Sequence, residues 1–249
     1  MLTDPLFYAL AIPAVILVGL AKGGFSGLGS AGLPLMALAI SPVQAAAILL
    51  PILIVQDVVG VWSFRRTWDG RVLVAMLPGA VLGIFLGWLL AARVSAEAVM
   101  AALGAISILF AVQRLWVERG GRIVASASSP AWVGSLFGVA AGFTSQIAHA
   151  GSPPFQMWVM PKRLDHLTFA GTAAIFFAVV NWLKVPAYLA LGQFTRENML
   201  TAAALLPLAI VSTYAGVVLV RRVSGTRFYT AIYLLMIAVG AKLLWDAFS

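Results

Sequence analysis

Long apolar stretches recur along the whole chain, and they restrict its fold more than any other feature. They lie near residues 6–21, 43–64, 71–92, 97–116, 131–148, 165–190, 198–220 and 227–247. About 20 apolar residues let a helix cross a bilayer, and only helices or closed barrels satisfy their backbone in lipid. A barrel would show short segments of alternating polarity, whereas these stretches are continuously apolar. The sequence therefore predicts one all-α polytopic membrane domain over residues 1–249.

The composition excludes several other classes of protein. Hydrophobic residues make up 62% of the chain, charged residues 10%, and the mean hydropathy is +1.02, which excludes soluble globular and disordered chains. Cysteine is absent and histidine occurs only twice, so we expect no disulfide, no metal site and no cofactor. The pI of about 10.5 does not indicate a nucleic-acid partner, because the basic residues sit in short loops between apolar stretches.

The chain also contains an internal repeat. A shift of 119 residues superposes residues 19–42 on the second half, and a shift of 129 superposes a later part. The first shift pairs Gly19 with Gly138, Gly23 with Gly142, Ser26 with Ser145, Ala31 with Ala150, Gly32 with Gly151, Pro34 with Pro153 and Pro42 with Pro161. The second pairs Pro78 with Pro207, Gly87 with Gly216, Arg93 with Arg222, Val94 with Val223, Ser95 with Ser224 and Trp116 with Trp245. Two repeats, about 6–118 and 131–248, are typical of secondary transporters.

The loop charges indicate how these repeats are oriented. Net positive charge gathers at residues 65–71, 114–122, 162–165 and 221–227, and the positive-inside rule places such loops in the cytoplasm. Equivalent loops of the two repeats then face opposite sides, so we expect inverted repeats with both termini outside. A parallel arrangement, with residues 221–227 outside, is the alternative. We expect a multi-pass protein of the bacterial inner membrane.

An inverted repeat must cross the membrane an odd number of times. Three full helices and one broken, re-entrant hairpin in each repeat satisfy this count, which gives about eight transmembrane helices. The predicted hairpins cover about residues 6–41, entering from outside, and 131–162, entering from inside.

Each hairpin breaks at its tip, in residues 22–32 and 146–152, and proline follows both breaks. Ser152 before Pro153 indicates a helix start, because serine caps free amides and proline fits the first helical position. Inverted symmetry would bring two half-helix N-termini together, which favours an anion. The candidate substrate-binding residues are Lys22, Ser26, Ser30, Gly32, Ser145, Gln146, Gly151, Ser152, Asn181 and Lys184. The alternative is that the glycines only allow close helix packing and the prolines only kink helices.

Charged residues inside apolar segments are costly and therefore candidates for function. Lys22 and Lys184 would supply positive charge to an anion, although Lys22 could instead pair with Asp57 or reach the interface. Asp57 and His149 are the candidate proton carriers. A charge-neutralising role for Asp57 and a structural role for His149 remain open.

At these residues the chain resembles the sulfite exporter TauE/SafE family of membrane permeases, over about residues 10–248. The likeness rests on the two glycine/proline breaks and on a series of second-half segments. These are Ala170-Gly171-Thr172, Asn181-Trp182-Leu183-Lys184-Val185-Pro186-Ala187-Tyr188, Gly192-Gln193-Phe194-Thr195, Leu206-Pro207-Leu208 and Arg221-Arg222-Val223-Ser224. The resemblance implies a secondary carrier for small sulfur-containing anions such as sulfite or sulfonates, with export the implied direction.

The sequence thus predicts a secondary transporter, not an enzyme, that moves a small anion by alternating access with possible proton coupling. A passive anion channel on the same scaffold is the first alternative. An intramembrane enzyme or an assembly partner is the second, and a metal permease the weakest. The expected partners are the anion and the lipid bilayer; a homo-oligomer is left open.

Overall fold

The structure, a computed structural model, describes residues 3–24, 28–91, 93, 95–120, 129–220 and 226–248. Helices account for nearly all of this described part. Those of the first half are α1 (Pro5–Lys22), the 3-10 helix η1 (Leu28–Ala31), α2 (Gly32–Ala37), α3 (Pro42–Phe64), α4 (Gly70–Ala91) and α5 (Ala96–Glu118). Those of the second half are α6 (Ala131–Ala148), α7 (Ser152–Val159), the 3-10 helix η2 (Met160–Lys162), α8 (His166–Ala190), α9 (Arg196–Val220) and α10 (Thr226–Phe248). No strand occurs among these residues.

The predicted all-α membrane fold is confirmed. Seven helices within the described residues, α1, α3, α4, α5, α6, α8 and α9, are long and apolar enough to cross a bilayer. The stretch predicted at 227–247 forms α10. Local signals set several of the helix starts. The side chains of Asp4, Ser41 and Ser95 accept hydrogen bonds from the backbone N–H of Leu6, Gln44 and Ala98, which satisfies amides that the first helical turn leaves free.

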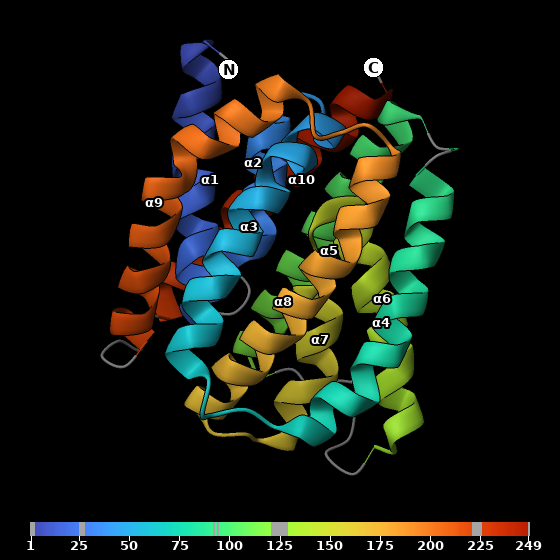
Figure 1. The fold of residues 1–249 in the computed structure, drawn as a ribbon, viewed down its shortest axis with the longest axis vertical. Coiled ribbons are helices and arrows are strands. Elements are labelled where there is room, and N and C mark those ends of the chain that lie inside the picture. The colour runs from blue at the N-terminus through green and yellow to red at the C-terminus, as the bar shows by residue number, and fades with distance from the viewer. Residues whose placement is uncertain are drawn as a thin grey trace.

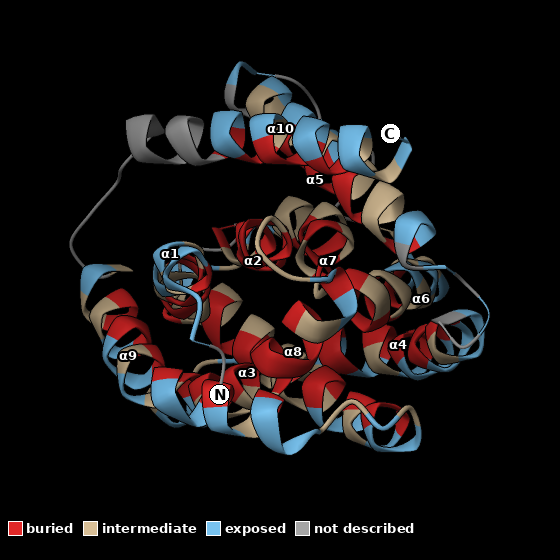
Figure 2. Ribbon diagram, turned by 90° about the horizontal axis from the view of Figure 1, so that it is seen from above, coloured by how far each residue is buried: buried red, intermediate tan, exposed pale blue. Residues whose placement is uncertain are grey.

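Each half of the chain contains one interrupted helix. In the first half α1 ends at Lys22, and the chain resumes as η1 and the short helix α2; in the second half α6 ends at Ala148 and α7 begins at Ser152. In the view from above, α2 and α7 lie in the interior, and exposed residues lie mainly on the outer faces of the surrounding helices (Figure 2). Helices α2 and α7, which follow the breaks, therefore lie inside the protein, where other side chains surround them.

The two halves pack against each other in an equivalent way. The first helix of each half packs along the fourth helix of the other half, α1 on α9 and α6 on α4, while α3 packs on α8 and α5 on α10. Both termini lie at one end of the bundle; α1 starts at that end and α6 at the opposite end (Figure 1). This arrangement supports inverted repeats, which, together with the orientation in the membrane, stay a prediction.

Glycines allow these helices to approach closely. A Cβ atom added to Gly83 of α4 would lie 2.1 Å from the carbonyl oxygen of Val139 in α6. A Cβ atom added to Gly23 would lie 2.4 Å from the backbone of Gly216 in α9. No side chain fits at such distances, so these positions act as contact points between helices. Close helix packing, the alternative interpretation of the glycines at the breaks, is therefore present at Gly23.

Candidate anion site between the two broken helices

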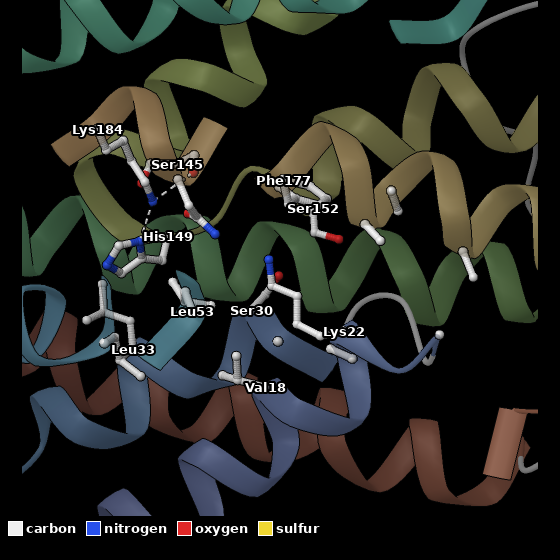
Figure 3. Close-up of a pocket in the computed structure, with 18 residues that line it drawn as sticks. Val18, Lys22, Ser30, Leu33, Leu53, Ser145, His149, Ser152, Phe177 and Lys184 are labelled. Carbon is white, nitrogen blue, oxygen red and sulfur yellow. Dashed lines mark hydrogen bonds between the residues drawn. The ribbon is translucent and has the colours of Figure 1, made fainter. Parts of the chain in front are cut away.

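A small cavity lies where the two interrupted helices meet. Its volume is about 70 Å³, which is room for several water molecules or a small solute. The first half of the chain contributes α1, η1, α2 and α3, and the second half contributes α6, α7 and α8. The lining residues are Val18, Ala21, Lys22, Gly24, Gly29, Ser30, Leu33, Leu49, Leu53, Ser145, His149, Ser152, Ala170, Ala173, Ala174, Phe177, Asn181 and Lys184. Figure 3 shows the polar side chains of both halves facing one another across it.

Lys22, at the end of α1, forms one of two charged clusters at the cavity. Its Nζ atom makes an ion pair with Asp57 of α3, and it lies 5.3 Å from the ring centroid of Phe177. The second carboxylate oxygen of Asp57 accepts a hydrogen bond of 2.6 Å from Nδ2 of Asn181. Asp57 therefore has a donor on each oxygen, one from each half of the chain. A buried carboxylate is stable only with such partners.

Lys184 of α8 forms the second cluster. Its side chain is fully buried, and its Nζ atom lies 2.6 Å from Nδ1 of His149 and 3.3 Å from both the carbonyl oxygen and Oγ of Ser145. On the other side of the ring, Nε2 of His149 lies 3.0 Å from the carbonyl oxygen of Ala46. Tyr188 stacks against the ring with the centroids 6.1 Å apart. The imidazole thus joins α3 to α8, and Figure 3 shows its hydrogen bond to Lys184.

The backbone at the end of α6 explains how His149 reaches this position. His149 has φ +49°, a left-handed conformation that is uncommon outside glycine. Its N–H donates to the carbonyl of Ser145, and the N–H of Ala150 donates to the carbonyl of Thr144. The bond from His149 to Ser145 is the αL end of a helix, and the left-handed residue turns the chain from α6 toward α7.

The three cavity serines have different bonding. Ser145 Oγ is in contact with Lys184. Ser152 Oγ accepts a 2.8 Å hydrogen bond from Nε2 of Gln156. Ser30 Oγ is buried and has no hydrogen-bond partner within the described residues. A buried hydroxyl without a partner costs free energy unless a ligand or water completes it, so Ser30 is available to a bound solute.

The predicted capping role of Ser152 is not observed. Gly151 occupies the N-cap position, Ser152 is the first residue of α7, and no side chain caps the helix. Pro153 and Pro154 follow and have no N–H group. The first turn of α7 consequently offers fewer amide donors to an anion than an ordinary helix start does, and the side chains carry more of the site.

Seven of the predicted site residues line the cavity: Lys22, Ser30, Ser145, His149, Ser152, Asn181 and Lys184. Asp57 lies behind them, bonded to two of them. Gly32, Gln146 and Gly151 are not among the lining residues. A Cβ on Gly32 would lie 2.3 Å from Cγ2 of Val18, so this position serves helix packing. Ser26 lies outside the described residues.

The apolar wall of the cavity was not predicted from the sequence. Leu33, Leu49, Leu53 and Phe177 form much of it. An apolar side chain in an apolar helix carries no pattern that marks it as lining a cavity. The only signal available was position: a shift of 119 relates Ser30 to His149 and Leu33 to Ser152, and all four line the cavity.

The charges of the site favour an anion. Two lysines line the cavity, and the carboxylate of Asp57 lies behind them, so with both lysines charged and His149 neutral the local charge is positive. Within the described part of the chain, no group of three or more histidine, cysteine or acidic side chains lies together as a metal site would require. Positive charge inside an apolar bundle has to be compensated, and a bound anion would compensate it.

Membrane-length helices, two of them interrupted around a buried cationic cavity, are features of a multi-pass membrane transport protein. A family model described as Sulfite exporter TauE/SafE matches residues 11–243. The chain therefore belongs to this family of membrane permeases, as the resemblance predicted. Comparison with the curated proteins and with the solved structures found no significant match.

Proposed function

We propose that this chain is a secondary transporter that exports a small sulfur-containing anion, sulfite or an organosulfonate, by alternating access. The observation that carries the proposal is the cavity at the tips of both interrupted helices, which two lysines line and where Asp57, paired with Lys22, is the carboxylate found nearby among the described residues. Family membership supports transport of this class of solute. The substrate, the direction and the mode of transport are parts of the proposal.

The side chains of the cavity can bind an anion whose oxygen atoms are grouped at one end. Lys22, Lys184 and the free hydroxyl of Ser30 can donate hydrogen bonds to those oxygens, and charge-assisted bonds of this kind are the strong ones. The ring of Phe177 and the leucines would contact a short carbon chain. A sulfonate with a small organic part uses both surfaces, whereas sulfite uses only the polar one.

The position of the two hairpins supports the proposal of alternating access. Residues from α1, η1 and α2 form one side of the cavity, and residues from α6, α7 and α8 form the other. Movement of one hairpin relative to the long helices would open the cavity toward one end of the bundle. Repeat-based carriers work by such rocking around a fixed central site.

Counterflow in proteoliposomes tests the proposal. Vesicles loaded with unlabelled sulfite or taurine are diluted into a trace of the labelled compound, and a carrier accumulates label transiently because its site faces the two sides in turn. Lys184→Met should reduce this exchange at least about tenfold, since a hydrogen bond from a charged group contributes about 1.5–3 kcal/mol. Lys242→Met is the matched control, because Lys242 is exposed and pairs only with Asp246 in α10. Flux without counterflow would indicate a channel, and absence of flux for every sulfur anion would refute the proposal.

A further inference from the structure

The contacts of His149 fix where its protons can be. Its Nε2 atom lies 3.0 Å from the carbonyl oxygen of Ala46. A carbonyl oxygen only accepts hydrogen bonds, so Nε2 carries a hydrogen. Nδ1, on the opposite side of the ring, lies 2.6 Å from Nζ of Lys184. Between these two nitrogens there is room for one hydrogen. With the positive charge of Lys184, the pair holds it either as an ammonium beside a neutral imidazole or as an imidazolium beside a neutral amine.

Both arrangements leave the Lys184–His149 pair with a single positive charge. A second proton would place two cations in direct contact, which is strongly unfavourable away from water. The surroundings do not offset it. Ser145 supplies a carbonyl and a hydroxyl, Tyr188 stacks on the ring, and the nearby Lys22 is a further cation. Asp57, the one carboxylate near the cavity, already accepts from Lys22 and Asn181.

An anion in the cavity would change this balance. Lys184 and His149 both line the cavity, so an anion there lies close to both and supplies the missing negative charge. The ammonium of Lys184 can then turn from Nδ1 to the anion. The lone pair of Nδ1 is left free, and the anion stabilises a positive charge on the ring.

We propose that the Lys184–His149 pair holds one proton when the cavity is empty and binds a second when an anion enters, so that each anion crosses with one proton. The second proton comes from water, forms an N–H bond at Nδ1 of His149, and returns to water when the anion leaves. This coupling rests on the anion transport proposed above. It assigns proton binding to His149 and Lys184, and it leaves Asp57 as the fixed counter-ion of Lys22.

Nitrogen NMR on labelled histidine tests the first half of the inference without altering the pair. The chain has only two histidines, and the other, His166, is exposed at the start of α8, so His166→Gln leaves a single imidazole to observe. Without an anion, the pair should hold one proton across the range in which a free histidine titrates, and no titration step should appear. Saturating sulfite or ethanesulfonate should convert the ring to imidazolium. A ring that titrates freely in the empty protein, or one unchanged by a bound anion, would overturn the inference.

Calorimetry in buffers of different ionisation enthalpy counts the protons. The wild type should take up one proton for each anion bound. His149→Asn should still bind, because asparagine tolerates the left-handed backbone, but it should take up none. Ser107→Ala, which alters a buried hydroxyl that is bonded to Leu103 and is not part of the cavity lining, should behave as the wild type. Binding without proton uptake in the wild type, or unchanged uptake in His149→Asn, would refute the coupling alone. If none of the anions binds, the proposed function is refuted, and the coupling with it.

Discussion

Asp57 connects the two halves of the chain through single side-chain contacts. It pairs with Lys22 of α1 and accepts from Asn181 of α8, and its side chain is only 2% exposed. Both predicted interpretations of Lys22, anion binding and pairing with Asp57, are compatible with this geometry, because Lys22 also lines the cavity. The ion pair sets the position of the ammonium group at the edge of the cavity.

Breaking this ion pair from one side should destabilise the protein. Asp57→Asn leaves the Lys22 ammonium in a largely buried place without a counter-charge, and removing one partner of a buried pair costs about 3–5 kcal/mol. We expect a clear fall in the melting temperature of the purified protein in detergent. The double variant Lys22→Met with Asp57→Asn should regain much of the loss, because no unpaired charge remains. A single variant as stable as the wild type would show that the pair does not contribute to folding.

Substitutions of the cavity serines should affect anion affinity and melting temperature differently. Ser30→Ala removes a hydroxyl that has no partner among the residues the structure describes, so the melting temperature should stay nearly constant while anion affinity falls by up to about tenfold, the value of one hydrogen bond. Ser152→Ala removes the acceptor of Gln156 and should lower the melting temperature as well. Thermal stabilisation by sulfite or taurine, measured against concentration, gives both quantities for each variant. Unchanged affinity in Ser30→Ala would place the anion away from this hydroxyl.

At the scale of helices, the glycines determine which pairs can touch. The backbone of α6 approaches α4 at Gly83, and the backbone of α9 approaches Gly23, the residue after α1. Both contacts join the first helix of one half to the fourth helix of the other. A long helix of the opposite half therefore holds each hairpin in place. During transport the hairpin would have to slide or tilt along that contact.

Two glycine substitutions should have opposite effects. Gly83→Ala places a Cβ atom 2.1 Å from the carbonyl oxygen of Val139, so α4 and α6 must separate, at a cost of about 1–3 kcal/mol. In Gly60→Ala the nearest atom, the carbonyl oxygen of Lys22, is 3.4 Å away, and alanine in a helix interior is favoured over glycine by up to about 1 kcal/mol. The first variant should melt below the wild type and the second at or above it. Equal melting temperatures would show that the α4–α6 contact is not tight.

Helix positions and spacing were predictable because they follow local patterns. The length of the apolar stretches predicted the spanning helices. Glycine in such helices is typical of close helix contacts. Helix α7 starts at Ser152, one residue earlier than the serine and proline signals predict. Those signals place Ser152 at the N-cap, but Gly151 occupies that position. A cap depends on the turn that precedes it, and here that turn is set by the left-handed backbone of His149.

Contacts between residues far apart in the chain were harder to predict from the sequence. The repeat located both breaks and brought His149, Ser30 and Ser152 to one place. It could not show that Lys184 would face His149 across 35 residues, or that Asn181 would reach Asp57 across 124. Such pairs depend on the rotation of each helix about its axis, and the repeat shift does not specify that rotation. Phe177 was missed for a related reason, since only the fold brings its ring to Lys22.

Orientation in the membrane is the remaining property of the whole molecule that the charges predict. Both termini lie at one end of the bundle (Figure 1), and basic residues such as Arg65, Arg66 and Lys162 follow helices that end away from it. Lysine and arginine near helix ends remain on the cytoplasmic side, so the termini should face outward.

The absence of cysteine allows a direct measurement of this orientation. Thr3→Cys marks the end that holds the termini, and His166→Cys marks the opposite end; both positions are exposed. In right-side-out vesicles a membrane-impermeant maleimide should label Thr3→Cys at once and His166→Cys only after the membrane is permeabilised. The reverse pattern would place the basic loops outside and contradict the positive-inside assignment. Equal labelling of both from one side would contradict a bundle that spans the bilayer from end to end, and with it the inverted hairpins on which the site depends.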